Sequence, residues 1–300
     1  YMRFRSFKKK RSCLVKLVYT LLLLAIFLGS AEYICRQRGV QPWKIHGVNI
    51  TVTPGGKFFQ KHPTLGYTHL PGHYNVRLPD GYAFTATHQK NTLRVTCPQD
   101  RNSTQSGKPA LWIFGCSITY GWSLNDYETY PWLLQERLPD YEVVNFGVNG
   151  YGTVHSLIQF REALVKYPSP IAAIIAYTAF HDERNTFLRN RRKAIVEWNH
   201  LGSLNQPYAK LKGNRLYMAI DEVEYRPFLL MKYSAFSHFL EQQYNQMEDH
   251  FYHSHDVTKA VLSEFAKVAK ARGVQLIVVQ LTSDAATNDT IDYAKTFPVI

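Results

Sequence analysis

One serine stands where a buried strand would deliver a nucleophile to the edge of a sheet. The stretch from Ala110 to Gly121 reads ALWIFGCSITYG, in which four apolar residues end at Gly115 and Ser117 follows two positions later. A short apolar run that ends in glycine and serine is typical of a strand followed by a nucleophile-bearing turn. Gly and Ser are also common in ordinary strand-to-helix turns, so this stretch alone leaves both interpretations open.

The elements that must position Ser117 are apolar strands that alternate with amphipathic helices. We predict strands at Ala110 to Phe114, Glu142 to Phe146, Ile171 to Tyr177 and Val274 to Leu281. We predict helices at Tyr130 to Leu138, Val154 to Tyr167 and Asp256 to Gly273, the last with Asp256 as N-cap and Gly273 as its stop. This alternation predicts βαβ units and a parallel sheet covered on both faces. Because ligands bind at the carboxyl ends of such strands, the loops that follow the first three strands are the candidate site.

Three segments, in this order and spacing, resemble the first three conserved blocks of the SGNH, or GDSL-type, hydrolases. They read FGCSITYG (114–121), VVNFGVNGYGT (143–153) and AYTAFHDERN (176–185), and we call them the first, second and third block. The resemblance implies an α/β three-layer sandwich with a parallel, flavodoxin-like sheet. It also implies that Ser117 is the nucleophile and that Gly150 contributes to the oxyanion hole.

The third block of that family normally reads Gly-x-Asn-Asp, and its Asn donates to the oxyanion. Here the positions 179–182 read Ala-Phe-His-Asp, so His181 takes the place of the Asn, and Asn185 is a second candidate donor one helical turn later. A neutral imidazole can donate one N–H to an oxyanion. A role of His181 as the base for Ser117, or as a packed loop histidine, stays open. Cys116 replaces the Asp that usually precedes the serine.

The base of the family comes from a late Asp-x-x-His block, and no Asp in this sequence is followed three residues later by His. Serine is a weak nucleophile without a base that takes its proton. We therefore expect the block beyond Ile300, so that residues 108–300 form a C-terminally incomplete SGNH-type domain with an insertion at 186–255.

The resemblance implies a serine-dependent ester hydrolase, esterase-like or deacetylase-like, that acts on an O-acyl substrate such as a carbohydrate or lipid ester. One alternative is an O-acyltransferase that acts on an exported glycan, because the chemistry is the same until the acceptor arrives. Another is a catalytically inactive protein of this fold that binds a glycan. We expect no cofactor and no metal, because the sequence has no phosphate-binding Gly-rich loop and no CxxC or His/Cys spacing.

The formal charge of +12 is concentrated at the N-terminus. Residues 1–38 hold nine basic residues and one acid, which leaves 26 basic and 22 acidic residues in the remainder. A nearly balanced body argues against nucleic-acid binding, and a basic tail beside an apolar run favours a membrane topology.

The apolar run from Leu17 to Cys35 has 19 residues, with Glu32 as its only charge. Since about 20 apolar residues cross a bilayer, we predict a single-pass transmembrane anchor at 17–35 after a basic cytoplasmic tail at 1–16. Seven basic residues precede the run and two follow it, which places the N-terminus in the cytoplasm and the body on the extracytoplasmic side, periplasmic or lumenal. A signal peptide cleaved near Ala31 is the alternative, although the run is longer than a typical signal core.

Residues 36–107 are rich in Gly, Pro, Thr, Tyr and His, with Pro-Gly and Asp-Gly turns, and they predict hairpins that we call the β-rich preface. Four irregularly spaced histidines there (His62, His69, His73 and His88) are expected at the surface or in packing roles. A disulfide between Cys97 and Cys116 is left open.

The insertion begins with a basic run and later contains an apolar stretch. The basic residues are Arg184, Arg189, Arg191, Arg192 and Lys193. They would either receive an anionic substrate or form a solvated helix face. The Tyr- and Phe-rich stretch from Tyr225 to Phe239 is expected to pack on the core as a cap.

Overall fold

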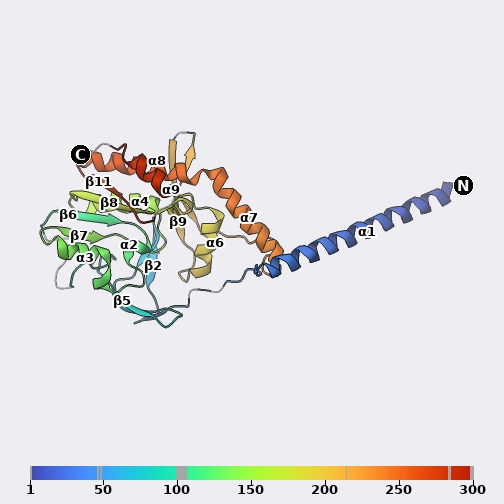
Figure 1. Ribbon diagram of the computed structural model, residues 1–300, viewed down its shortest axis with the longest axis horizontal. Coiled ribbons are helices and arrows are strands. Elements are labelled where there is room, and N and C mark those ends of the chain that lie inside the picture. Colours follow the sequence, from blue (N-terminus) through green and yellow to red (C-terminus); the bar gives the residue numbers. More distant parts are fainter. Residues whose placement is uncertain are drawn as a thin grey trace. The chain divides into compact units, whose positions relative to one another are not determined.

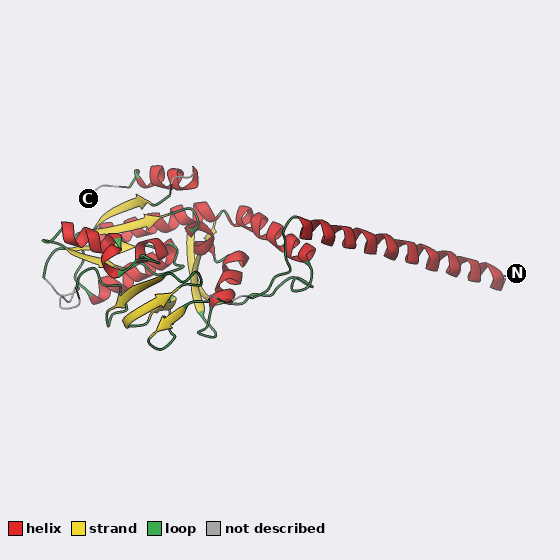
Figure 2. Cartoon of the chain, turned by 60° about the horizontal axis from the view of Figure 1, so that its bottom comes forward, coloured by secondary structure: helices red, strands yellow, loops and turns green. Residues whose placement is uncertain are grey.

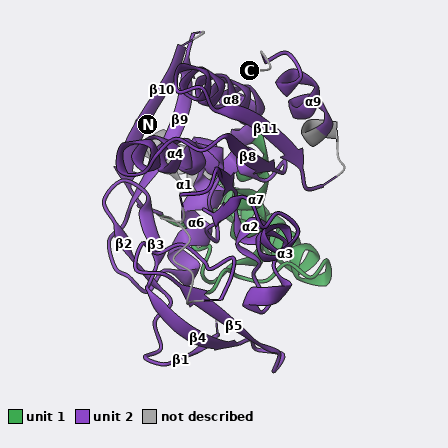
Figure 3. Ribbon diagram, turned by 90° about the vertical axis from the view of Figure 1, so that its left-hand side faces the viewer, with its two compact units in different colours: residues 1–46, 226–247 green, residues 47–225, 248–300 purple. Residues whose placement is uncertain are grey.

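The computed structural model describes residues 2–45, 47, 49–98, 107–213, 215–282 and 285–297. The chain divides into two compact units (Figure 3). The first unit comprises residues 1–46 and 226–247, and the second comprises residues 47–225 and 248–300. The second unit holds residues 47–107 of the predicted β-rich preface and residues 108–225 and 248–300 of the predicted α/β domain, while residues 36–46 and 226–247 group with the first unit.

The second unit is built on a four-stranded parallel sheet. Its strands are β6 (Ala110–Phe114), β7 (Glu142–Asn145), β8 (Ala172–Tyr177) and β11 (Gln275–Gln280), in the order β11-β8-β6-β7. This is the strand order of flavodoxin-like folds, in which the connections leave in opposite directions at the point between β6 and β8. The predicted fold class is confirmed, and each predicted strand agrees with the structure to within one residue at each end.

Helices cover both faces of this sheet and make three layers (Figure 1). They are α2 (Ser117–Tyr120), η1 (Asp126–Glu128), α3 (Tyr130–Arg137), α4 (Thr153–Lys166), α5 (His181–Thr186), α8 (Ser254–Ala271) and α9 (Ala285–Ala294). Helices α4 and α8 share one core with the sheet, where Phe160 stacks on Phe265 with ring centroids 4.5 Å apart and both rings contact Phe114. This buried aromatic cluster fixes the strands whose ends carry the candidate site.

The predicted start of α8 is wrong by two residues. The helix begins at Ser254, because His253 before it adopts a left-handed conformation with φ of 48° and separates it from α7 (Ala235–Tyr252). Asp256 therefore lies in the first helical turn and is not the N-cap. The predicted stop is confirmed, since Gly273 follows the last turn with φ of 66°.

The β-rich preface forms two small antiparallel sheets (Figure 2). One joins β1 (Thr51–Thr53), β4 (Gly72–Arg77) and β5 (Ala83–His88), and the other is the hairpin of β2 (Phe59–His62) and β3 (Gly66–His69). His69 and His88 are buried and stack at a centroid distance of 4.4 Å, which confirms a packing role for these two. Cys97 and Cys116 both lie in the described part of the chain, and no disulfide joins them.

The insertion contains α6 (Arg189–Trp198), a hairpin of β9 (Asn205–Lys212) and β10 (Arg215–Glu222), and the whole of α7. The hairpin packs on the core of α4 and α8 through Ala209. The cap expected at Tyr225 to Phe239 is wrong, because the chain from Arg226 onward groups with the N-terminal residues. Met231 is buried in this segment, whereas Leu229, Leu230 and Tyr233 are exposed.

The first unit begins with the long helix α1 (Met2–Gln37). The segment Val15–Gln37 is long and apolar enough to cross a membrane, and its side chains are mostly exposed. This agrees with the predicted anchor by length and composition, while the side of the membrane stays a prediction.

Candidate active site

The carboxyl ends of three parallel strands bring the three blocks together. Phe114 of β6 pairs with Ile175 of β8, and Ile113 pairs with Asn145 of β7, so the segments after these strands leave from the same edge of the sheet. Ser117 follows β6 and His181 follows β8, which are the two strands on either side of the topological switch point. Open α/β sheets bind their ligands at this position.

Ser117 is the first residue of α2, and the turn around it, which we call the serine turn, is tightly held. Its carbonyl accepts hydrogen bonds from the N–H groups of Gly121 and Trp122, both at 2.9 Å. Gly115 before it has no room for a side chain, because a Cβ there would lie 2.1 Å from Thr119 Oγ1. Among the described residues, neither the Oγ nor the backbone N–H of Ser117 makes a hydrogen bond. The hydroxyl is thus half-exposed, rigidly placed and unengaged.

The second block is fastened directly to the serine turn. The Val148 N–H donates to the Gly115 carbonyl at 3.2 Å, and the Asn145 side chain donates to the Thr119 carbonyl at 3.1 Å. Gly147 fits against this turn only without a side chain, since its Cβ would lie 2.4 Å from the Tyr120 nitrogen. The predicted proximity of the first two blocks is therefore present in the structure.

Gly150 occupies a left-handed position with φ of 80°, where a Cβ would lie 2.5 Å from the Tyr67 hydroxyl. Its carbonyl accepts a hydrogen bond from Arg191 Nη2 at 2.6 Å. Its N–H has no hydrogen-bond partner within the part of the chain that the structure describes. The backbone N–H groups of Ser117 and Gly150 thus both lack a partner among the described residues.

His181 is the first residue of α5 and is 1% exposed. Its ring lies between those of Tyr177 and Phe180, with centroid distances of 5.8 and 5.2 Å. Neither ring nitrogen has a hydrogen-bond partner among the described residues. Burial, together with the charge of Arg184, holds the pKa of His181 well below its usual value, so the imidazole is neutral. A neutral ring suits an N–H donor better than a general base, since a base works best with a pKa near the working pH.

Asn185, the second candidate donor, is already engaged. Its Oδ1 accepts the N–H of Val154 at 2.9 Å, and its Nδ2 donates to Thr258 Oγ1 at 2.7 Å. The side chain is fully buried and ties α5 to the starts of α4 and α8. In this arrangement Asn185 positions the helices, whereas both ring nitrogens of His181 stay without a hydrogen-bond partner among the described residues.

Two arginines of the basic run donate hydrogen bonds to backbone carbonyls of the second block, which the sequence did not predict. Arg191 is 7% exposed and also donates to the Tyr67 hydroxyl at 3.2 Å, while Arg184 donates to the Tyr151 carbonyl at 3.1 Å. Neither arginine pairs with a carboxylate within the described residues. These two arginines do not form a solvated helix face, since Arg191 is buried and both donate to backbone carbonyls of the second block.

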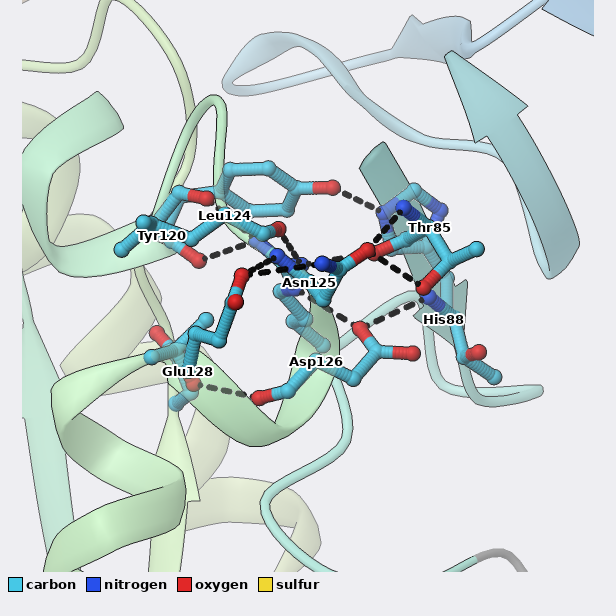
Figure 4. A network of polar contacts seen from close by, with 12 residues as sticks. Thr85, His88, Tyr120, Leu124, Asn125, Asp126 and Glu128 are labelled. Carbon is cyan, nitrogen blue, oxygen red and sulfur yellow. Dashed lines mark hydrogen bonds and ion pairs between the residues drawn. The ribbon is translucent and has the colours of Figure 1, made fainter. Parts of the chain in front are cut away.

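The β-rich preface fixes the serine turn through Arg94, which sequence reasoning missed. This arginine is 1% exposed and uses every N–H of its guanidinium. Its Nε donates to Asp126 Oδ1 at 3.0 Å, its Nη1 to the carbonyls of Tyr120 and Gly121, and its Nη2 to those of Thr85 and Leu124. Figure 4 shows this network around Asp126, in which the Tyr120 hydroxyl also reaches His88 at 2.8 Å.

Replacing Arg94 by lysine is expected to lower the free energy of unfolding by about 2 kcal/mol, because several buried carbonyls lose their donor. The measurement is urea unfolding, with Arg77→Lys as control, since Arg77 is exposed and makes one long hydrogen bond at 3.3 Å. Equal midpoints for the two variants would contradict the role given to Arg94.

A cavity of about 600 Å³ opens beside the second block. Its lining includes Phe58, Phe59, Trp122, Trp198, Leu201 and Gly150. Trp122 lines this cavity, and its backbone N–H donates to the Ser117 carbonyl. The candidate oxyanion site thus borders an aromatic pocket made largely by the β-rich preface and the insertion.

A second histidine, His255 at the start of α8, lies between two carboxylates. Its Nδ1 lies 2.9 Å from Asp182 Oδ2 and its Nε2 lies 2.7 Å from Asp289 Oδ2, so the protonated ring can donate to both carboxylates. Burial lowers the pKa of His255, but the hydrogen bonds to Asp182 and Asp289 outweigh it and raise the pKa above its usual value. This ion triad holds α9 and α8 against the third block, and both ring nitrogens are occupied.

The raised pKa of His255 predicts a stability contribution that is complete below about pH 6.5 and is lost as the pH rises through the folded-state pKa. The unchanged protein should lose part of its melting temperature between pH 6 and pH 8, and this loss should be smaller in His255→Gln. His253→Asn is the control, because His253 is 71% exposed and the substitution suits its left-handed backbone. An equal loss in His255→Gln would show that the triad does not link protonation to folding.

No protein-family model and no curated protein matches the sequence. Among solved structures, TesA is similar over 63% of this chain and 68% of its own, with 16% identity and a TM-score of 0.32. AlinE4, an SGNH-hydrolase family esterase, is similar over 31% of this chain and 52% of its own, with 23% identity and a TM-score of 0.24. This chain thus spans about half the length of AlinE4.

Proposed function

We propose that this protein is a serine-dependent ester hydrolase with Ser117 as its nucleophile. The observation that carries the proposal is the arrangement at the switch point, where an unengaged Ser117 hydroxyl shares the sheet edge with two unpaired backbone N–H groups, those of Ser117 and Gly150. Acyl transfer needs a nucleophile and donors for a tetrahedral oxyanion in the same place. The neutral ring of His181 is the third donor in this proposal.

The reaction proceeds in two steps. Ser117 Oγ attacks the acyl carbonyl and gives its proton to a base, and the oxyanion is held by the N–H groups of Ser117 and Gly150 until the alcohol leaves. Water then attacks the acyl-enzyme and releases the acid and the serine. No histidine among the described residues is hydrogen-bonded to Ser117 Oγ, and the expected Asp-x-x-His block would supply the base.

The substrate in this proposal is a small-molecule or glycan O-acyl ester on the extracytoplasmic side of a membrane, with the N-terminus in the cytoplasm. The anchor supports this location by its length and by the basic residues before it. Transfer of the acyl group to a sugar hydroxyl remains the second candidate, since the acyl-enzyme is common to both reactions. Labelling by a fluorophosphonate tests the proposal, because such probes react with activated serines, and labelling at any residue other than Ser117 would contradict it.

The aromatic pocket beside Gly150 is the proposed site of the acyl group, because its interior residues Phe58 and Tyr67 are buried and apolar in character. Trp198→Ala should lower kcat/KM for an octanoyl aryl ester by roughly tenfold more than for the acetyl ester, since each buried methylene contributes about 0.8 kcal/mol. Trp132→Ala on α3 is the matched control, as Trp132 hydrogen-bonds Glu136 and lies outside the pocket lining. An unchanged octanoyl-to-acetyl ratio in Trp198→Ala would place the acyl group elsewhere.

A further inference from the structure

Within the first unit, the beginning of α7 contacts Glu32, the one charged residue of the predicted anchor. The carboxylate of Glu32 accepts hydrogen bonds from Arg36 Nε at 2.7 Å and Ser234 Oγ at 2.7 Å. It also accepts the backbone N–H groups of Ala235 at 3.0 Å and Phe236 at 2.9 Å. These two N–H groups belong to the first turn of α7 and have no acceptor within the helix, so Glu32 caps α7.

Further contacts fix the same segment along the end of α1. The rings of Phe27 and Phe236 meet edge to face, with centroids 6.3 Å apart. The backbone N–H of Trp43 donates to the Met231 carbonyl at 3.0 Å, and Met231 is fully buried. His238 Nδ1 lies 2.6 Å from the Gln41 carbonyl and donates to it. The segment 228–238 is therefore held by the anchor and by the residues directly after it.

These contacts set the depth of the segment in a membrane. If Leu17 to Cys35 crosses the bilayer, Phe27 lies eight residues, or about 12 Å, inside the end at Cys35. Glu32 lies three residues, or about 5 Å, inside the same end. The groups that touch Phe27 and Glu32 must share their depth, which places Phe236 among the acyl chains and Ser234 close to the head groups.

Three exposed side chains of this segment are large and apolar, and beside them the exposed Lys232 places its Nζ over the Trp43 ring at 6.0 Å, where a lysine can reach the head groups. Leu229 is 86% exposed, Leu230 is 60% exposed and Tyr233 is 78% exposed. Irregular backbone inside a bilayer needs internal hydrogen-bond partners, and the segment supplies them. The N–H groups of Tyr233 and Ser234 both donate to the Leu230 carbonyl at 2.8 Å, and Ser237 Oγ donates to the Leu229 carbonyl at 2.5 Å.

We propose that residues 228–236 form a membrane-inserted wedge that does not span the bilayer. The wedge packs on the anchor through Glu32 and Phe27, and it presents Leu229, Leu230 and Tyr233 to the lipid of the leaflet at the Gln37 end of α1. The occupant is lipid, because Ser234 and Phe236 contact α1 inside its Cys35 end, and the Tyr233 carbonyl accepts from Arg36 directly after that end, so the exposed side chains beside them lie at the membrane boundary. This inference rests on the anchor and is independent of ester hydrolysis.

The test places an amino acid with a dansyl side chain at position 229 of the whole chain, reconstituted in phosphatidylcholine vesicles. Position 23 in α1 is the membrane reference, and position 165 in α4 is the aqueous reference, because Val165 is 84% exposed in the second unit. Lipids brominated on their acyl chains should quench the probes at 229 and 23 strongly and leave the probe at 165 unchanged. Aqueous iodide should quench only the probe at 165.

Each other outcome overturns the proposal in a distinguishable way. Quenching at 23 with none at 229 would leave the anchor intact and remove the wedge. A blue-shifted probe at 229 that neither bromine nor iodide reaches would mean that protein covers these leucines. No quenching at 23 would contradict both the anchor and the wedge. Hydrolysis of a soluble ester is a separate measurement, which reports on Ser117 alone.

Discussion

Replacing Ser117 by alanine is expected to lower hydrolysis of a short-chain aryl ester by 10³-fold or more. The loss is large because removal of a nucleophile leaves only binding and oxyanion stabilisation, which together give a small part of the rate. The fold should be unchanged, since Ser117 Oγ makes no hydrogen bond with any described residue. The measurement is kcat/KM by release of the aryl alcohol, together with the urea midpoint of both proteins.

Ser203→Ala is the matched control for this substitution. Ser203 belongs to the same unit, hydrogen-bonds Glu222 at the surface, and lies outside the three blocks and the pocket lining. Its removal should leave kcat/KM within a few-fold of the original value. If Ser117→Ala behaved like this control, Ser117 would not be the nucleophile, and the proposed hydrolase would be reduced to a binding protein of the same fold.

The sheet and the positions of its strands were predictable because each strand is a short, buried apolar run between turn residues. Such a run carries its own signal, and β6, β7, β8 and β11 all agree with the prediction to within one residue. The place of the loops that hold Ser117 and Gly150 follows from the same signal, since both loops begin where a strand ends. The resemblance of the blocks then assigned roles to Ser117 and Gly150, which the structure brings to one sheet edge.

The residues that hold the site were not predictable from local patterns. Arg94 and Arg191 donate to backbone carbonyls of segments far away in the sequence. Every residue has a backbone carbonyl, so no residue type marks such a partner in the sequence. His255 meets Asp289 across 34 positions, at a spacing that no metal or catalytic motif uses. The start of α8 was misplaced because His253 adopts a left-handed backbone, which is uncommon for residues other than glycine.

Replacing His181 by alanine is expected to lower kcat by roughly 10² to 10³-fold, or about 3 to 4 kcal/mol, with little change in KM, because an oxyanion exists only along the reaction path. His181→Asn restores an N–H donor and should recover part of this loss. If His181 were instead the base, asparagine could not accept the proton and both variants would be equally inactive, but its depressed pKa argues against this role. The three proteins are compared with one acetyl ester, and their melting temperatures separate lost chemistry from lost packing against Tyr177 and Phe180. Nearly equal kcat in the alanine variant and the original protein would make His181 a packed histidine and leave the oxyanion to the two backbone N–H groups.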